Sequence, residues 1–124
     1  MDKGKIRNEF FNQLNNSDTK KDAVKVLENE ESIIEKILSS TNLKDFYEDV
    51  KIFFMMIKDF INGRCDIPIR TIAAIVIALL YVLNPLDFIP DAIAVVGLSD
   101  DAFVLKLCLD FVRDDIEEYK LKCL

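Results

Sequence analysis

The sequence contains no histidine, so the side chain that serves most often as a general base or metal ligand is missing. No G-x-S-x-G motif, P-loop or G-x-G-x-x-G loop occurs either. A carboxylate-pair hydrolase is not excluded by residue type, but nothing else in the sequence supports one. We therefore expect no catalytic residue and a non-enzymatic protein, with a divalent cation as the one cofactor worth considering.

Cysteine is scarce: Cys65, Cys108 and Cys123 are an odd number at wide spacing, and no C-x-x-C pair occurs. This pattern argues against a disulfide framework and against a zinc site. We expect ordinary reduced thiols, as in a protein that faces the cytosol or a membrane.

Glycine and proline are also scarce, with three of each in 124 residues. Long stretches without these breakers, rich in Lys, Glu, Leu and Ile, favour helices. The composition is 51% hydrophobic and 31% charged, which is typical of a folded chain. The length predicts one domain that can bury its own core.

The chain carries a net charge of −6 and has no run rich in lysine and arginine, so nucleic-acid binding is disfavoured. Its first sixteen residues lack the apolar region and small-residue cleavage site of a signal peptide. We expect a cytoplasmic protein, either free or at the inner face of the membrane.

Helical spacing of apolar residues predicts an all-α, single-domain bundle of about five helices plus a short helical turn. Ser17 or Asp18 is the expected cap of the second helix, and Gly63 the expected end of the third. A charged interruption at residues 28–31 predicts a bend or break in the second helix. The predicted helices cover residues 1–16, 19–38, 43–62, about 68–83, 92–96 and 100–122.

The predicted helix over 68–83 is the central element, because Thr71–Leu83 has no charge on any face. A helix that is apolar all round lies either in a protein core or in lipid. Its thirteen residues rise only ~20 Å, short of the ~30 Å hydrocarbon slab, so a simple spanning helix is not expected. A proline-rich hairpin follows it.

The stretch YVLNPLDFIPDAIAVVGLSDD, residues 81–101, looks like the signature of the YkvA-like family, which is roughly Y-L-x-x-P-x-D-x-I-P-D followed by G-x-x-D-D. The resemblance covers about residues 43–118, with departures at Arg64-Cys65 and Ala94-Val95. The matching positions are Tyr81, Asn84, Pro85, Asp87, Ile89, Pro90, Asp91, Gly97, Asp100 and Asp101.

The YkvA-like family consists of small helical proteins, mostly bacterial, whose domain has no known function. The resemblance implies an all-helical fold and often a membrane association, but no known reaction. It divides the chain into an N-terminal helical extension, residues 1–42, and a YkvA-like helical domain, residues 43–124. We expect the two parts to form one compact unit.

Four aspartates, Asp87, Asp91, Asp100 and Asp101, are the candidate metal ligands. If the hairpin brings them together, their oxygens suit Mg²⁺ or Ca²⁺. Their spacing matches neither an EF-hand nor a D-D-x-x-D site, since position 104 is valine. Each also lies near a predicted helix start, where a carboxylate caps free N–H groups. Capping is the favoured interpretation.

Three functions remain open. In the first, the protein is membrane-associated, with Thr71–Leu83 and Ala92–Leu98 as a re-entrant hairpin, although Asp87 and Asp91 would then lie at depth. In the second, it is a soluble bundle that binds a protein partner through an apolar surface, or a second copy of itself. Size and charge would also suit an antitoxin or immunity factor, without any supporting motif. In the third, a divalent-cation-dependent enzyme uses the four aspartates.

Calorimetric titration with Mg²⁺, Ca²⁺ and Mn²⁺ tests the third function, the divalent-cation-dependent enzyme. Because capping explains the four aspartates, we expect no heat of binding. Heat that disappears in an Asp87→Asn, Asp91→Asn double variant would instead support a cation site, whereas heat unchanged by that variant would place binding elsewhere.

Overall fold

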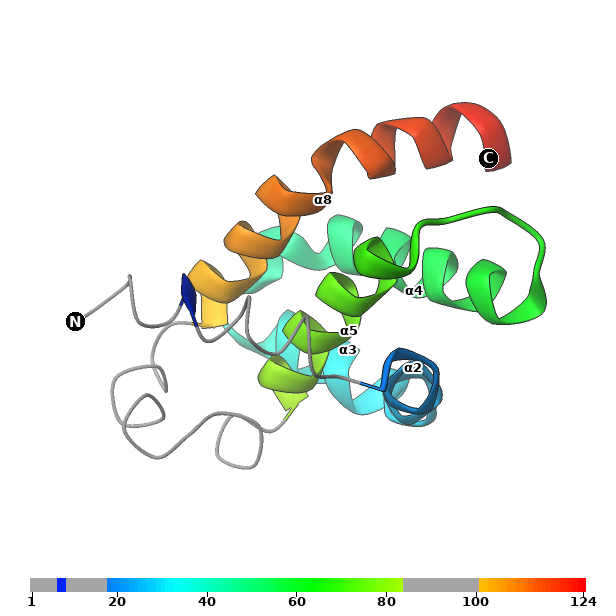
Figure 1. Ribbon diagram of the computed structural model, residues 1–124. Helices are drawn as coiled ribbons and strands as arrows, with labels where there is room; N and C mark the ends of the chain where they lie inside the picture. The colour runs from blue at the N-terminus through cyan, green and yellow to red at the C-terminus, as the bar shows by residue number, and fades with distance from the viewer. Residues whose placement is uncertain (1–6, 9–17, 84–100) are drawn as a thin grey trace.

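The computed structural model describes residues 7–8, 18–83 and 101–124 of the chain. Every regular element in these ranges is a helix, so the predicted all-α fold is confirmed (Figure 1). The helices expected over 1–16 and 92–96 and the proline-rich hairpin lie outside or largely outside the described residues. The boundary between residues 42 and 43 stays a prediction.

The region predicted as one helix over 19–38 forms two, α2 (Thr19–Glu28) and α3 (Glu30–Ser39). Asp18 caps α2, because its side chain accepts a hydrogen bond from the Lys21 backbone N–H at 3.3 Å. The break falls at Asn29, whose side-chain amide donates to the Lys25 carbonyl at 2.8 Å. Both the cap and the break agree with the sequence prediction.

The third predicted helix begins with a short 3₁₀ turn, η1 (Lys44–Phe46), and continues as α4 (Tyr47–Asn62). Gly63 ends α4 with a φ of 67°, a left-handed conformation that glycine adopts at little cost. The Gly63 and Arg64 N–H groups donate to the Phe60 and Asp59 carbonyls at 3.3 and 2.9 Å, which satisfies the end of the helix.

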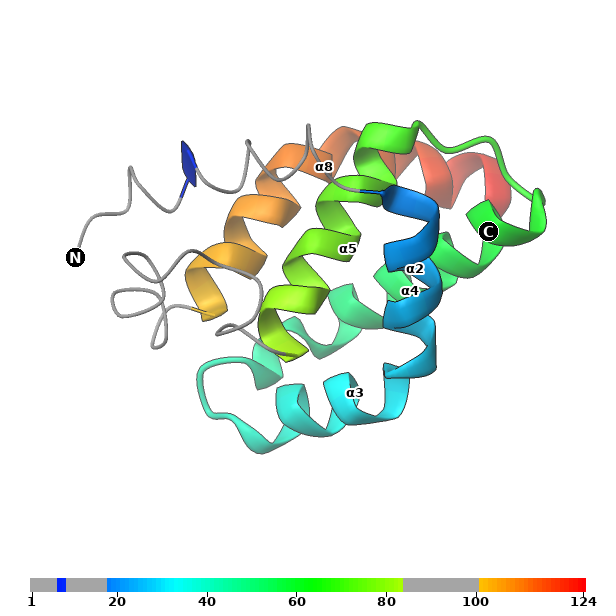
Figure 2. The same ribbon diagram turned by 60° about the horizontal axis from the view of Figure 1, so that its bottom comes forward.

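Helix α5 (Ile69–Leu83) occupies the centre of the bundle, where it packs against α2, α3, α4 and α8 (Figures 1 and 2). All twelve residues from Thr71 to Val82 are buried. Protein therefore covers the apolar helix on every side. Lipid could reach the α5 half of the predicted re-entrant hairpin only if the bundle opened, and the other half, Ala92–Leu98, lies outside the described residues.

Helix α8 (Asp101–Cys123) changes character along its length. Its first half buries Val104, Leu105, Cys108 and Val112 against the core, with α5 as its main partner. Beyond residue 112 the helix is mostly exposed and charged. On the exposed side of α8, the Arg113 guanidinium forms an ion pair with the Asp110 carboxylate at 2.7 Å.

The carboxyl end of α5 is held by a lysine from α3. The Lys36 ammonium donates a short hydrogen bond to the Val82 carbonyl, and the contact is partly buried. The last carbonyls of a helix lack partners within the helix and carry partial negative charge, so a lysine there is doubly favourable. This contact ties α3 to the point where the family motif begins.

A pair of leucine substitutions tests whether α5 is the core. Leu79 is fully buried on α5, whereas Leu38 on α3 is 52% exposed. Leu79→Ala should lower the free energy of unfolding by about 2–5 kcal/mol, and Leu38→Ala by no more than about 0.5 kcal/mol. Urea denaturation measures both, and equal effects would mean that protein does not enclose α5.

Candidate functional site

The structure describes two of the ten motif positions. Tyr81 is buried on α5, and Asp101 is the first residue of α8. Asp87, Asp91 and Asp100 lie outside the described residues, as do Asn84, Pro85, Ile89, Pro90 and Gly97. Convergence of the four aspartates therefore stays a prediction.

The described ranges hold no group of three or more acidic or cysteine side chains arranged for a metal ion. They also hold no helix that is both long and apolar enough to cross a membrane. The chemically distinctive part of these ranges is instead the end of the bundle where the chain enters α5 and α8 finishes.

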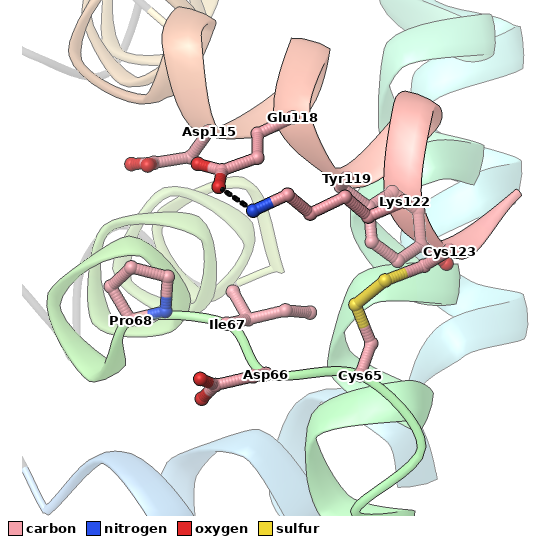
Figure 3. A pocket seen from close by; sticks show the side chains of 9 residues that line it. All are labelled: Cys65, Asp66, Ile67, Pro68, Asp115, Glu118, Tyr119, Lys122 and Cys123. Atoms are coloured by element: carbon pink, nitrogen blue, oxygen red, sulfur yellow. Dashed lines mark hydrogen bonds and ion pairs between the residues drawn. A yellow bond between two sulfur atoms is a disulfide. The ribbon is translucent and has the colours of Figure 1, made fainter.

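At this end Cys65 and Cys123 form a disulfide, across a sequence separation of 58 residues and with Cα atoms 6.1 Å apart (Figure 3). The expectation of reduced thiols is wrong for these two cysteines. Their pairing depends on α8 running along α5 until its last turn meets the linker after α4, and spacing in the sequence does not reveal that meeting. Cys108 remains a free thiol, and its complete burial raises its pKa well above the usual value.

We call residues 63–70 and 119–124 the disulfide end. Beside the disulfide lies a cavity of about 20 Å³, enough for about one water molecule. On its rim the Lys122 ammonium donates to the Glu118 carboxylate at 2.6 Å, and that bond raises the lysine's pKa (Figure 3). The lining residues are Cys65, Asp66, Ile67, Pro68, Asp115, Glu118, Tyr119, Lys122 and Cys123.

Two further hydrogen bonds fasten α8 at this end. The Tyr119 hydroxyl donates to the Asp59 carboxylate of α4 at 2.6 Å, and the Thr71 hydroxyl of α5 donates to Asp115 at 2.6 Å. Burial, and then the hydrogen bond to Asp59, raise the pKa of Tyr119 from 10.0 to about 12. The second half of α8 is thus fastened to both α4 and α5.

The surface of the disulfide end combines exposed aliphatic side chains with cations. The three most exposed large hydrophobic side chains of the described residues are all here: Leu121 at 84%, Leu124 at 61% and Ile69 at 59%. Arg64, Arg70, Lys120 and Lys122 are exposed beside them, against one acid, Asp66. These groups can bind an apolar or anionic surface.

The family motif lies next to the other end of α5, and the sequence carries only a weak signal for the disulfide end. Leu121 and Leu124 are apolar residues in an otherwise charged last turn, and Ile69 precedes Arg70 at the start of the apolar helix. Nothing in those local patterns says that residues 69 and 121 lie at the same end of the molecule.

Substitution of Tyr119 tests its hydrogen bond to Asp59. Tyr119→Phe should cost about 1–2 kcal/mol of unfolding free energy at neutral pH. Since the folded state holds the phenolic proton more tightly, this stabilisation is complete below pH 10 and is lost as the pH rises toward about 12. Urea denaturation across this range should therefore show a flatter alkaline loss for the variant than for the wild type.

The matched control is Tyr47→Phe, which removes a hydroxyl from a ring whose centre lies 4.9 Å from the Lys51 ammonium. This variant should keep the alkaline slope of the wild type. A Tyr119→Phe protein with that same slope would contradict the proposed role of Asp59.

Comparison with known proteins identifies the family. Residues 71–107, which span α5, the motif and the start of α8, match the family described as "Protein of unknown function (DUF1232)". A Bacillus subtilis (strain 168) protein named "Uncharacterized membrane protein YkvA" is 36% identical over 87 residues, 68% of this chain and 80% of that protein. No solved structure matches. The resemblance seen in the motif is thus confirmed, and the chain belongs to the YkvA-like family, whose function is unknown.

Proposed function

We propose that this protein acts by binding rather than by catalysis, and that it docks peripherally on a membrane surface through the disulfide end. The observation that carries the proposal is the position of its three most exposed large hydrophobic side chains, Ile69, Leu121 and Leu124, all at that end. Large aliphatic side chains left in water are costly in a soluble monomer unless something covers them.

The charges of the disulfide end fit an anionic lipid surface. Residues 63–70 and 119–124 carry four exposed cations against one acid, although the whole chain has a net charge of −6. Each lysine or arginine near an anionic membrane contributes about 1 kcal/mol of attraction. The preceding residues 114–118 carry four acids, of which Asp115 accepts the Thr71 hydroxyl and Glu118 pairs with Lys122, while Asp114 and Glu117 lie exposed.

A peripheral mode agrees with the dimensions of the fold better than a spanning mode. The fifteen residues of α5 rise about 22 Å, short of the ~30 Å hydrocarbon slab. The same helix supplies the core that α2, α3, α4 and α8 cover. Shallow insertion of exposed leucines with flanking lysines leaves that core intact, as in other proteins that lie at the membrane interface.

The Bacillus subtilis relative supports this proposal, because it is named as a membrane protein. The lack of histidine supports binding over catalysis. A soluble protein-binding module remains the alternative, because the same apolar side chains suit a protein partner or a second copy of the chain.

Flotation with lipid vesicles tests the proposal. The protein should float with phosphatidylcholine vesicles that contain phosphatidylglycerol, and less so as the salt concentration rises. Leu121→Ser, Leu124→Ser should weaken binding by about tenfold or more, because burial of each leucine contributes more than 1 kcal/mol.

Leu38→Ser is the matched control, since Leu38 is also exposed but lies on α3, near Lys36 and therefore at the opposite end of α5. It should float like the wild type. A monomer recovered wholly in the soluble fraction, with no vesicle binding at low salt, would contradict membrane docking and favour the protein-binding alternative.

A further inference from the structure

We propose that Cys65 and Cys123 form a redox site: a dithiol reduces the disulfide, and the second half of α8, residues 113–123, then detaches from a core that stays folded. The proposal is independent of membrane docking, because it rests on how this segment is fastened to the bundle. The substrate class is a protein or small-molecule dithiol.

The second half of α8 has few noncovalent attachments. Of residues 113–124, Tyr119 is the one buried side chain, and Ile116 and Cys123 are partly buried against the core. The segment's hydrogen bonds to the rest of the bundle are Tyr119 to Asp59 and Thr71 to Asp115. The first half instead buries four apolar side chains. Regions with few buried apolar contacts open locally at a free energy well below that of global unfolding.

The disulfide is therefore the strongest attachment of the segment. It joins Cys123, the last residue of α8, to the linker between α4 and α5, so a single covalent bond anchors the tip of the helix (Figure 3). Without that bond, detachment has to break two hydrogen bonds, expose one buried tyrosine and free the partly buried Ile116 and Cys123 from the core. With it, the tip stays beside Cys65 even when those contacts break.

A reductant can reach the sulfur atoms. Both cysteines are only partly buried, and they line a surface hollow of about 540 Å³ together with Arg64, Lys122 and other residues. The attacking species in thiol–disulfide exchange is a thiolate anion. The charges of Arg64 and Lys122 beside the disulfide are balanced by Asp66 and Glu118, which line the same hollow, so its lining has no net charge to repel a thiolate.

The exchange balances in two steps. One thiolate of the dithiol attacks a sulfur of the pair, which forms a mixed disulfide and releases the other cysteine as a thiolate that takes a proton from water. The second thiol of the reductant, as its thiolate, then attacks the mixed disulfide and releases the remaining cysteine. Two electrons pass to the protein, and the dithiol becomes a disulfide.

Cys108 serves as an internal control for this chemistry. It lies in the first half of α8, fully buried in the core. A core that stays folded must therefore shield this thiol from alkylation while Cys65 and Cys123 become reactive.

Hydrogen–deuterium exchange of the whole chain, with and without dithiothreitol, tests the proposal. Reduction should speed exchange in residues 113–123 by about tenfold or more, while residues 71–82 change by less than about twofold. Cys65→Ser, Cys123→Ser should reproduce the reduced pattern without reductant, and Cys108→Ala should respond to reductant like the wild type. Unchanged exchange in 113–123, or an equal loss of protection in 71–82, would overturn the proposal.

Alkylation with iodoacetamide, read by peptide mass spectrometry, gives a second measure that needs no variant. The oxidised native protein should label at none of its cysteines. After dithiothreitol, Cys65 and Cys123 should label and Cys108 should not. Labelling of Cys65 and Cys123 without reductant, or of Cys108 together with them, would overturn the proposal.

Discussion

An apolar helix without a polar face can remain in water only if other parts of the chain surround it. The fold of this protein meets this requirement by enclosing α5 with other helices. From Thr71 to Val82, α5 presents no charge in any direction and is buried throughout. Four amphipathic or half-apolar helices are needed to enclose it, and α2, α3, α4 and α8 each turn their apolar side toward it.

The backbone groups at the two ends of the buried α5 need hydrogen-bond partners, and the two ends obtain them in different ways. At the carboxyl end the ammonium of Lys36 donates a hydrogen bond to the Val82 carbonyl. At the amino end, the Pro68 carbonyl accepts the Thr71 and Ile72 N–H groups, and Thr71 donates to Asp115. The first end is held by charge, and the second by hydrogen bonds reinforced by the Cys65–Cys123 disulfide.

This asymmetry shapes the functional proposals. The family motif follows the end held by Lys36, whereas exposed leucines, cations and the disulfide gather at the other. Membrane docking concerns the outer surface of the disulfide end, and the redox site concerns how firmly α8 is attached there. Both leave the buried α5 in place, which agrees with a fold whose stability depends on keeping that helix enclosed.

The sequence by itself determined the local features. The Asp18 cap, the break near Asn29, the glycine end of α4 and the extent of α5 follow from residues within one or two turns of each other. The motif at residues 81–101 also identified the family, although most of it lies outside the described residues. Tertiary structure alone decided that protein covers α5, that Cys65 meets Cys123, and that Tyr119 reaches Asp59 across sixty residues. Capping and helical periodicity act between near neighbours in the chain, whereas these pairings depend on how whole helices pack.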